Sequence, residues 1–120
     1  MKQNIVKEQS LQLSFEAINI YKMLIEKNEF ILSKQFLRAA TSIGANIHEA
    51  DAGYSKKDFA AKMSIASKEA RETNYWVILL KHSELVKYDW NEFDNTLEEL
   101  IKLLTAIVKT SNFRTFESTH

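Results

Sequence analysis

Apolar residues recur every three or four positions along four segments, at about residues 5–27, 34–52, 56–83 and 90–110. This spacing puts apolar side chains on one side of an α-helix, so each segment is predicted to be an amphipathic helix. The third segment has the longest regular stripe, through Phe59, Met63, Ala66, Ala70, Thr73, Val77 and Leu80. The first segment carries two neighbouring stripes, Leu11, Phe15, Ile18 and Ile25 beside Leu13, Ala17, Ile20 and Leu24.

The connections between these segments are short, and the chain contains no proline and only two glycines. Short connections force neighbouring helices to run antiparallel. The sequence therefore predicts an all-α protein, an antiparallel up-down-up-down four-helix bundle that forms one domain over residues 1–120.

Polar residues stand where helix ends need them. Serine or aspartate precedes three of the predicted helices, at Ser33, Ser55 and Asp89, and an acid follows three positions later at Asp58 and Glu92. Such residues accept hydrogen bonds from the free N–H groups of the first turn. Gly53 is predicted to end the second helix in the left-handed conformation that glycine adopts easily.

The composition narrows the class of protein. The chain has 16 basic and 16 acidic side chains, so it lacks the strong positive charge typical of proteins that bind nucleic acid or membranes by charge alone. The absence of cysteine excludes disulfides, thiolate metal ligands and cysteine nucleophiles. The first ten residues lack the apolar core of a signal peptide, and no apolar run approaches the length of a membrane span. We expect a cytoplasmic protein with no membrane partner.

Two clusters are candidates for chemistry. His48 and Asp51 share a helix face with Glu49 beside them, but a metal site needs about three convergent ligands and no second cluster must meet this one. Glu69 and Glu72 lie one helical turn apart, as charged residues on a helix surface often do. The chain also lacks a nucleophile elbow and a phosphate-binding glycine loop. We predict no catalytic residues, no metal site and no cofactor.

Charge is unevenly distributed along the chain. Residues 34–81 carry eight basic and five acidic side chains, whereas residues 84–99 carry one basic and six acidic ones. A basic surface on the second and third helices would meet phosphates of RNA or DNA, through Lys34, Arg38, Lys56, Lys57, Lys68 and Arg71. Two alternatives are that opposite patches steer one subunit onto another, or that these charges form an ordinary solvated surface.

The apolar residues of two helices extend beyond a single stripe. On the third helix, Tyr75 and Ile78 lie off the main stripe, and the first helix is apolar around more than half of its circumference. Small residues at Ala60, Ala61 and Ser64 would let another helix approach closely. A four-helix monomer needs one apolar stripe per helix, so the wider coverage predicts self-association.

Residues 29–80 closely resemble the family of 23S rRNA intervening-sequence proteins, often labelled ribosomal-protein-like. The shared features are Ser42, Ile43, Gly44, Ala45, Asn46, Ile47, Glu49, Ser55, Lys56, Phe59, Lys62, Ile65, Ala66, Glu69, Ala70, Glu72, Tyr75 and Trp76. The resemblance implies a four-helix bundle that assembles as a homopentameric ring, with a poorly defined biochemical role. A related branch, the accessory variability determinant of diversity-generating retroelements, is a basic pentamer that works with a reverse transcriptase and binds nucleic acid.

The shared motif has a physical interpretation. Gly44 and Ala45 remove bulk from the second helix and would permit close approach of another helix, which should offset the cost of a helical glycine, roughly 1 kcal/mol. Asn46 and Glu49 lie three apart on another face, where they would hydrogen-bond across helices or between subunits. We therefore predict a non-enzymatic, self-assembling bundle, a homopentameric scaffold or accessory protein. The alternative is an accessory protein that binds RNA or DNA.

Overall fold

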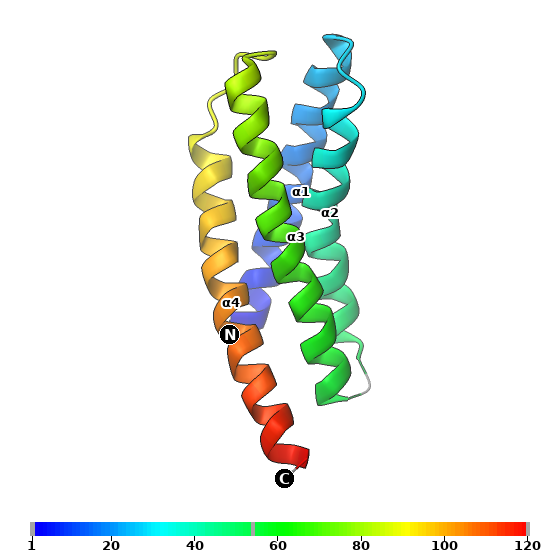
Figure 1. Cartoon of the computed structure of the whole chain (residues 1–120), viewed down its shortest axis with the longest axis vertical. Helices are drawn as coiled ribbons and strands as arrows, with labels where there is room; N and C mark the ends of the chain where they lie inside the picture. The colour runs from blue at the N-terminus through cyan, green and yellow to red at the C-terminus, as the bar shows by residue number, and fades with distance from the viewer. Residues whose placement is uncertain (1, 54, 120) are drawn as a thin grey trace.

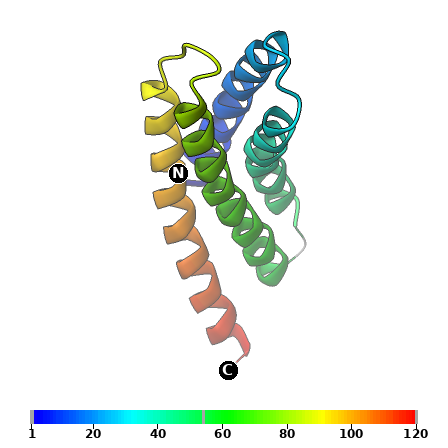
Figure 2. The ribbon, with the colours of Figure 1, turned by 45° about the horizontal axis from the view of Figure 1, so that its top comes forward.

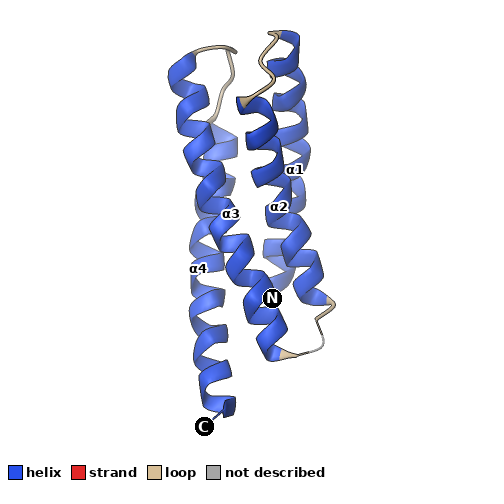
Figure 3. Ribbon diagram, turned by 45° about the vertical axis from the view of Figure 1, so that its right-hand side comes forward, coloured by secondary structure: helices blue, strands red, loops and turns tan. Residues whose placement is uncertain are grey.

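A computed structural model describes residues 2–53 and 55–119, with side-chain surroundings for residues 4–53 and 55–112. It contains four helices over these residues and no strand, in a rod measuring 54 × 22 × 20 Å. The helices are α1 (Lys2–Glu26), α2 (Leu32–Asp51), α3 (Lys56–Ser83) and α4 (Asn91–Thr119). Figure 1 shows them side by side along the long axis, and Figure 3 shows only short loops between them.

The helices form a closed square in which α1 contacts α2, α2 contacts α3, α3 contacts α4 and α4 contacts α1. The backbones of α1 and α3 do not approach each other closely over the described residues, nor do those of α2 and α4, so the members of each pair occupy opposite corners. The α1–α2 and α3–α4 connections lie together at one end, and the α2–α3 connection lies at the other (Figures 1 and 2). This confirms the predicted all-α, antiparallel four-helix bundle.

The fourth helix is longer than predicted. It continues to Thr119 rather than ending near residue 110, and its last turns project beyond the α2–α3 end of the bundle (Figure 1). Residues 110–119 contain neither glycine nor proline, so nothing in the local sequence stops a helix that is already formed.

The core lies between the inward stripes of all four helices. One stripe of α1, comprising Leu13, Ala17, Ile20 and Leu24, is fully buried, whereas Leu11, Phe15 and Ile18 of the neighbouring stripe are exposed and Ile25 is half-buried. Near the α1–α2 and α3–α4 turns, Phe36 packs against Trp90 and Phe93 with ring centroids 6.2 and 5.6 Å apart. These three rings hold the first turns of α2 against the start of α4.

The cap of α3 is confirmed, but that of α2 is not Ser33. Ser55 Oγ accepts a hydrogen bond from the backbone N–H of Asp58, 3.0 Å away. At α2 the carboxylate of Glu29 takes the capping role instead, accepting hydrogen bonds from the N–H groups of Ile31, Leu32 and Ser33. Burial alone would raise the pKa of Glu29, but these hydrogen bonds outweigh it and hold the pKa below its usual range.

Helix α4 begins slightly later than predicted. The side chain of Asp89 accepts a hydrogen bond from the N–H of Asn91, 3.0 Å away, so this aspartate supports the first turn from just outside the helix. The N–H of Asp94 bonds to the carbonyl of Trp90, which opens the helical hydrogen-bond ladder.

The prediction that Gly53 ends α2 in the left-handed conformation is wrong, because no described glycine has a positive φ. Helix α2 ends instead in tightened turns, with the N–H groups of Ala52 and Gly53 bonded to the carbonyls of Glu49 and Ala50. A Cβ at position 53 would lie 3.1 Å from the carbonyl oxygen of Ala50. Glycine is therefore used here for its small size.

Two non-glycine residues adopt the left-handed conformation at helix ends, Asn28 with φ 61° and Glu84 with φ 54°. We expect Glu84→Gly to raise the free energy of unfolding by about 0.5–1 kcal/mol, because a Cβ is unfavourable in this conformation. Asn28→Gly should gain less, since asparagine tolerates it better. Urea denaturation would measure both, and a loss of stability in Glu84→Gly would contradict the expectation.

Candidate assembly faces

The outward stripe of α1 exposes large apolar side chains to solvent. Leu11, Phe15 and Ile18 follow one another at helical spacing and are between 37% and 54% exposed. We call these three residues the α1 face. Ile5 is also exposed, about two turns before Leu11. The sequence shows two apolar stripes on this helix, but only their burial distinguishes the core stripe from the α1 face.

A second apolar surface lies on α3. Ile65, Tyr75 and Ile78 are between 41% and 55% exposed, and we call them the α3 face. The ring of Tyr75 packs edge-on against Trp76, with centroids 5.2 Å apart, so the exposed ring has a fixed neighbour. Tyr75 and Ile78 were expected to lie at an assembly surface, and both are exposed.

The two faces lie on opposite corners of the bundle, because the described backbones of α1 and α3 do not approach each other closely. Among residues 4–53 and 55–112, the other large apolar side chains exposed to solvent are Ile5 and three residues at the turns, Phe30, Ile31 and Leu85. The outer surfaces of α2 and α4 expose none in those ranges. Away from the turns, the large apolar side chains exposed to solvent in those ranges thus lie on α1 and α3.

Gly44 permits the close approach of α1 and α2. A Cβ at this position would lie 3.3 Å from Ser10 Oγ, tighter than ordinary van der Waals contact. Ser10 is fully buried and donates a hydrogen bond to the carbonyl of Lys7. The expected close contact at Gly44 is therefore inside one bundle, while its neighbour Ala45 is exposed.

The other small or polar candidates divide between the bundle and its surface. Ala60 is buried, Ser64 is half-buried and Ala61 is exposed. Asn46 donates a hydrogen bond to the carbonyl of Ser42 in its own helix, 2.8 Å away. Glu49 makes an ion pair of 2.7 Å with Lys62 across the α2–α3 contact. The contacts of both residues therefore lie within one subunit: Asn46 bonds to its own helix, and Glu49 pairs with a neighbouring helix.

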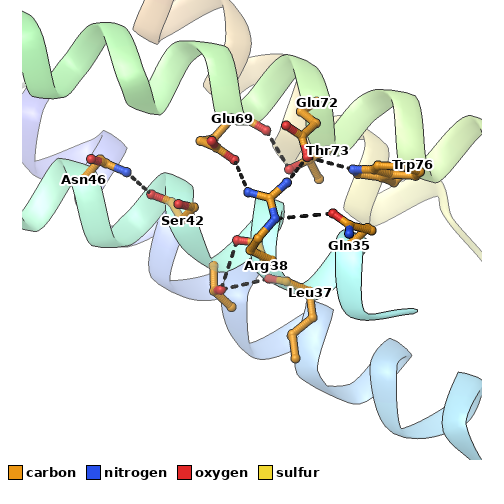
Figure 4. A network of polar contacts seen from close by, with 10 residues as sticks. Gln35, Leu37, Arg38, Ser42, Asn46, Glu69, Glu72, Thr73 and Trp76 are labelled. Carbon is orange, nitrogen blue, oxygen red and sulfur yellow. Dashed lines mark hydrogen bonds and ion pairs between the residues drawn. The ribbon is translucent and has the colours of Figure 1, made fainter. Parts of the chain in front are cut away.

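Arg38 joins α2 to α3 through both carboxylates that the sequence placed one turn apart. Its guanidinium lies 3.2 Å from Glu69 and also contacts Glu72, which in turn accepts a 2.9 Å hydrogen bond from Trp76 Nε1. Figure 4 shows Arg38 extending from α2 between these two side chains. The arrangement is that of an interhelical ion pair, in which Glu69 and Glu72 neutralise the charge of Arg38.

The six predicted nucleic-acid contacts do not converge on one surface. Lys34 lies in the first turns of α2, whereas Lys56 and Lys57 begin α3 at the opposite end, about 25 Å away at 1.5 Å per residue. Lys68 is exposed near the middle of α3, while Arg71 points toward α4 and donates a 3.0 Å hydrogen bond to Thr105. Because Arg38 is paired, the remaining candidates are lysines that lie far apart along the bundle: Lys34 at one end, Lys56 and Lys57 at the other, and Lys68 between them.

The acidic residues around His48 each have another partner. Asp51 pairs with Lys7 of α1 at 2.5 Å, and Glu49 pairs with Lys62 of α3. The Nδ1 atom of His48 lies 2.8 Å from the carbonyl oxygen of Gly44. Within the described part of the chain, no three His, Asp or Glu side chains are grouped to hold a metal ion.

One polar contact between distant segments has no counterpart in the sequence pattern. The hydroxyl of Tyr88 donates a 2.9 Å hydrogen bond to Glu16, linking the α3–α4 connection to α1. Burial raises the pKa of Glu16, the Tyr88 hydrogen bond lowers it, nearby Glu92 raises it, and the net shift is upward. Burial raises the pKa of Tyr88, and so do its hydrogen bond to Glu16 and the nearby carboxylates of Glu16, Glu92 and Asp89. The separation of 72 residues explains why the sequence alone did not indicate this pair.

None of the helices, over the residues described, combines the length and apolarity required to span a bilayer. The molecule is thus an antiparallel four-helix bundle whose main surface feature is a pair of exposed apolar faces.

The family model described as "23S rRNA-intervening sequence protein" matches residues 2–106, and the chain belongs to this family. This confirms the resemblance found in residues 29–80. Among solved structures, the chain is similar to a protein with unknown function from the S23 ribosomal protein family of Bacteroides thetaiotaomicron VPI-5482. The two chains are 46% identical, the match covers 91% of this chain and 99% of the other, and the TM-score is 0.85. No curated protein matches this sequence.

Proposed function

We propose that this protein is a non-enzymatic, self-assembling helical bundle that acts as a homopentameric scaffold or accessory protein. The observation that carries the proposal is the exposure of large apolar side chains on the α1 face and the α3 face. Water solvates these apolar side chains poorly, and contact with another copy would remove them from water at roughly 25 cal/mol per Å² of apolar area. Five is the subunit number that the family resemblance implies.

The polar groups support a structural role over a catalytic one. Arg38, Glu69 and Glu72 satisfy one another across the α2–α3 contact, and Glu49 and Asp51 are held by lysines of neighbouring helices. Groups used in this way stabilise the bundle and fix the relative positions of its helices. The scaffold proposal therefore accounts for Glu49, Lys62, Glu69 and Glu72 of the shared motif as groups that hold α2 and α3 together.

Nucleic-acid binding is the weaker alternative. Phosphate binding is strengthened by several cations that contact one backbone together. Here Arg38 is paired with two carboxylates, and Lys34 lies at the opposite end of the bundle from Lys56 and Lys57. Co-purified RNA or DNA that is released by salt would favour this alternative.

The proposal predicts that the purified protein is an oligomer at micromolar concentration. Light scattering coupled to size-exclusion chromatography should give about 70 kDa, five copies of the 13.9 kDa chain. Phe15→Glu should yield a monomer with unchanged helical content, because an unpaired carboxylate buried in an apolar contact costs several kcal/mol.

Phe30→Glu is the matched control for this experiment. Phe30 is 51% exposed and Phe15 is 54% exposed, but Phe30 lies at the α1–α2 turn and outside both faces. The control variant should keep the mass of the unaltered protein. A mass of 13.9 kDa for the unaltered chain at micromolar concentration would rule out the self-assembly proposal.

A further inference from the structure

Side-chain ion pairs directly join three of the four neighbouring helix pairs: α1–α2, α2–α3 and α3–α4. They are Lys7–Asp51 in the first, Arg38–Glu69, Arg38–Glu72 and Lys62–Glu49 in the second, and Lys81–Asp94 in the third. Where both partners lie within residues 4–53 and 55–112, no ion pair or side-chain hydrogen bond joins α1 directly to α4. The described backbones of α1 and α4 also make the least extensive contact of the four neighbouring pairs.

One polar link spans the α1–α4 side of the bundle indirectly. Tyr88, in the α3–α4 connection, donates a 2.9 Å hydrogen bond to Glu16 of α1. Burial raises the pKa of Glu16, this hydrogen bond offsets part of the rise, and the nearby carboxylate of Glu92 adds to it. Asp89 brings a further negative charge beside Tyr88. The ionised form of Glu16 is therefore less favourable in the folded protein than in the unfolded chain.

Gln9 is a second poorly satisfied polar group on the same side of α1. It lies seven residues, or two helical turns, before Glu16, so both side chains leave the helix in nearly the same direction. Among the described residues, the Oε1 atom of Gln9 is buried and has no hydrogen-bond partner. A buried oxygen without a partner destabilises the closed arrangement, because water would satisfy it in an open one.

We propose that the bundle opens along the α1–α4 contact, with the α1–α2 hairpin and the α3–α4 hairpin turning about the α2–α3 contact. The Tyr88–Glu16 hydrogen bond is the latch that holds the closed form. Opening hydrates Gln9 and Glu16, whereas the ion pairs of Arg38 and Lys62 keep α2 against α3.

The packing of Phe36 against Trp90 and Phe93 opposes this opening. The open form is therefore a minor state, reached at a lower free energy than global unfolding because the α2–α3 contact stays intact. All of these contacts lie within one copy of the chain, so the inference does not depend on self-assembly.

Cysteine labelling tests the opening, because the chain contains no cysteine of its own. Ala17→Cys puts a thiol in the fully buried stripe of α1, one residue after Glu16. Ala39→Cys puts one at an equally buried position of α2, next to Arg38 and the α2–α3 contact. A buried thiol reacts with iodoacetamide only after the bundle opens around it. Opening along the α1–α4 contact exposes position 17 and leaves position 39 covered, so Ala17→Cys should be labelled faster.

Changing the latch should alter labelling at position 17 alone. Tyr88→Phe removes the hydrogen bond to Glu16, and labelling at position 17 should become about fivefold faster, as for the loss of an average hydrogen bond. Glu16→Gln removes the ionised carboxylate and keeps an oxygen that accepts the Tyr88 hydroxyl, so it should slow labelling at position 17. Neither substitution should change the rate at position 39.

The labelling results decide between local opening and global unfolding. Equal rates at positions 17 and 39, or equal changes at both in Tyr88→Phe, would mean that the thiols react only through global unfolding and would overturn the inference. Faster labelling at position 17 that neither variant alters would remove Tyr88 and Glu16 from the role of latch. Circular dichroism checks that both cysteine variants fold.

Urea denaturation of Glu16→Gln in the cysteine-free chain keeps the latch testable if Ala17→Cys does not fold. Because the folded protein raises the pKa of Glu16, its protonation adds stability that is present below the ordinary pKa and lost as the pH rises through the raised one. Glu16→Gln should therefore be more stable than the unaltered chain at neutral pH and lose that advantage at about pH 3. Glu8→Gln, at an exposed position of the same helix, is the control and should change little at either pH. A less stable Glu16→Gln at neutral pH would contradict the proposed latch.

Discussion

Phe36→Ala should lower the free energy of unfolding by about 3–5 kcal/mol, the largest stability change expected for a single substitution in this chain. Phe36 is fully buried, and its ring contacts both Trp90 and Phe93. Truncation removes its apolar area from the core and leaves a cavity between α2 and the start of α4, which the remaining rings fill only in part. Since a whole domain is stabilised by about 5–15 kcal/mol, this loss should be visible as a large shift of the urea midpoint.

Phe30→Ala provides the control for this loss. Phe30 lies six residues earlier and is half-exposed, so its truncation should change the stability by about 0.5 kcal/mol or less. Phe36→Leu should fall between the two, at about 1–2 kcal/mol, and keeps the experiment informative if the alanine variant does not fold. All variants are compared at one protein concentration, because association of folded copies adds to the apparent stability. Equal losses at positions 30 and 36 would contradict the assigned core.

Gly44→Leu should destabilise the bundle by about 3 kcal/mol, because its side chain must enter the contact between α2 and Ser10 of α1. Helix propensity would favour leucine over glycine, so a loss of stability can be attributed to packing. Thermal unfolding followed by circular dichroism would measure the change. Ala45→Leu is the control, because Ala45 is exposed and its substitution should have little effect.

A double-mutant cycle with Ser10 isolates the contact further. In Gly44→Ala the new Cβ would lie 3.3 Å from Ser10 Oγ, so steric crowding opposes the gain in helix propensity of about 1 kcal/mol. In a Ser10→Ala background that oxygen is absent, and Gly44→Ala should be more favourable than in the unaltered chain. Identical effects in both backgrounds would show that Ser10 does not limit position 44.

Local features were predictable wherever a few neighbouring residues determine the outcome. The cap at Ser55 depends on a side chain and an N–H group three residues away, and the helical stripes depend on spacing alone. The cap of α2 was missed because the helix already begins at Leu32, which puts Ser33 inside it. The carboxylate of Glu29, from outside the predicted pattern, accepts the hydrogen bonds of Ile31, Leu32 and Ser33 instead. The end of α4 was missed because no residue there marks a stop.

The candidate surface was only partly predictable. The broad apolar coverage of the first and third helices indicated a surface for self-association, and Tyr75 and Ile78 were identified as part of it. Leu11, Phe15 and Ile18 were not separated from the core, because two adjacent stripes on one helix have equal periodicity. Arg38 was assigned to a phosphate-binding surface, since its pairing with Glu69 and Glu72 depends on residues more than 30 positions away.

By itself the sequence determined the four helices, their antiparallel order and the family, because periodicity, short connections and the shared motif are properties of neighbouring residues. Only the tertiary structure decided which stripe of α1 became core, which charges neutralise one another and that the α1 face and the α3 face lie on opposite corners of the bundle. Those outcomes depend on how helices rotate and align against each other, and this is set by the packing of residues that are far apart in the chain.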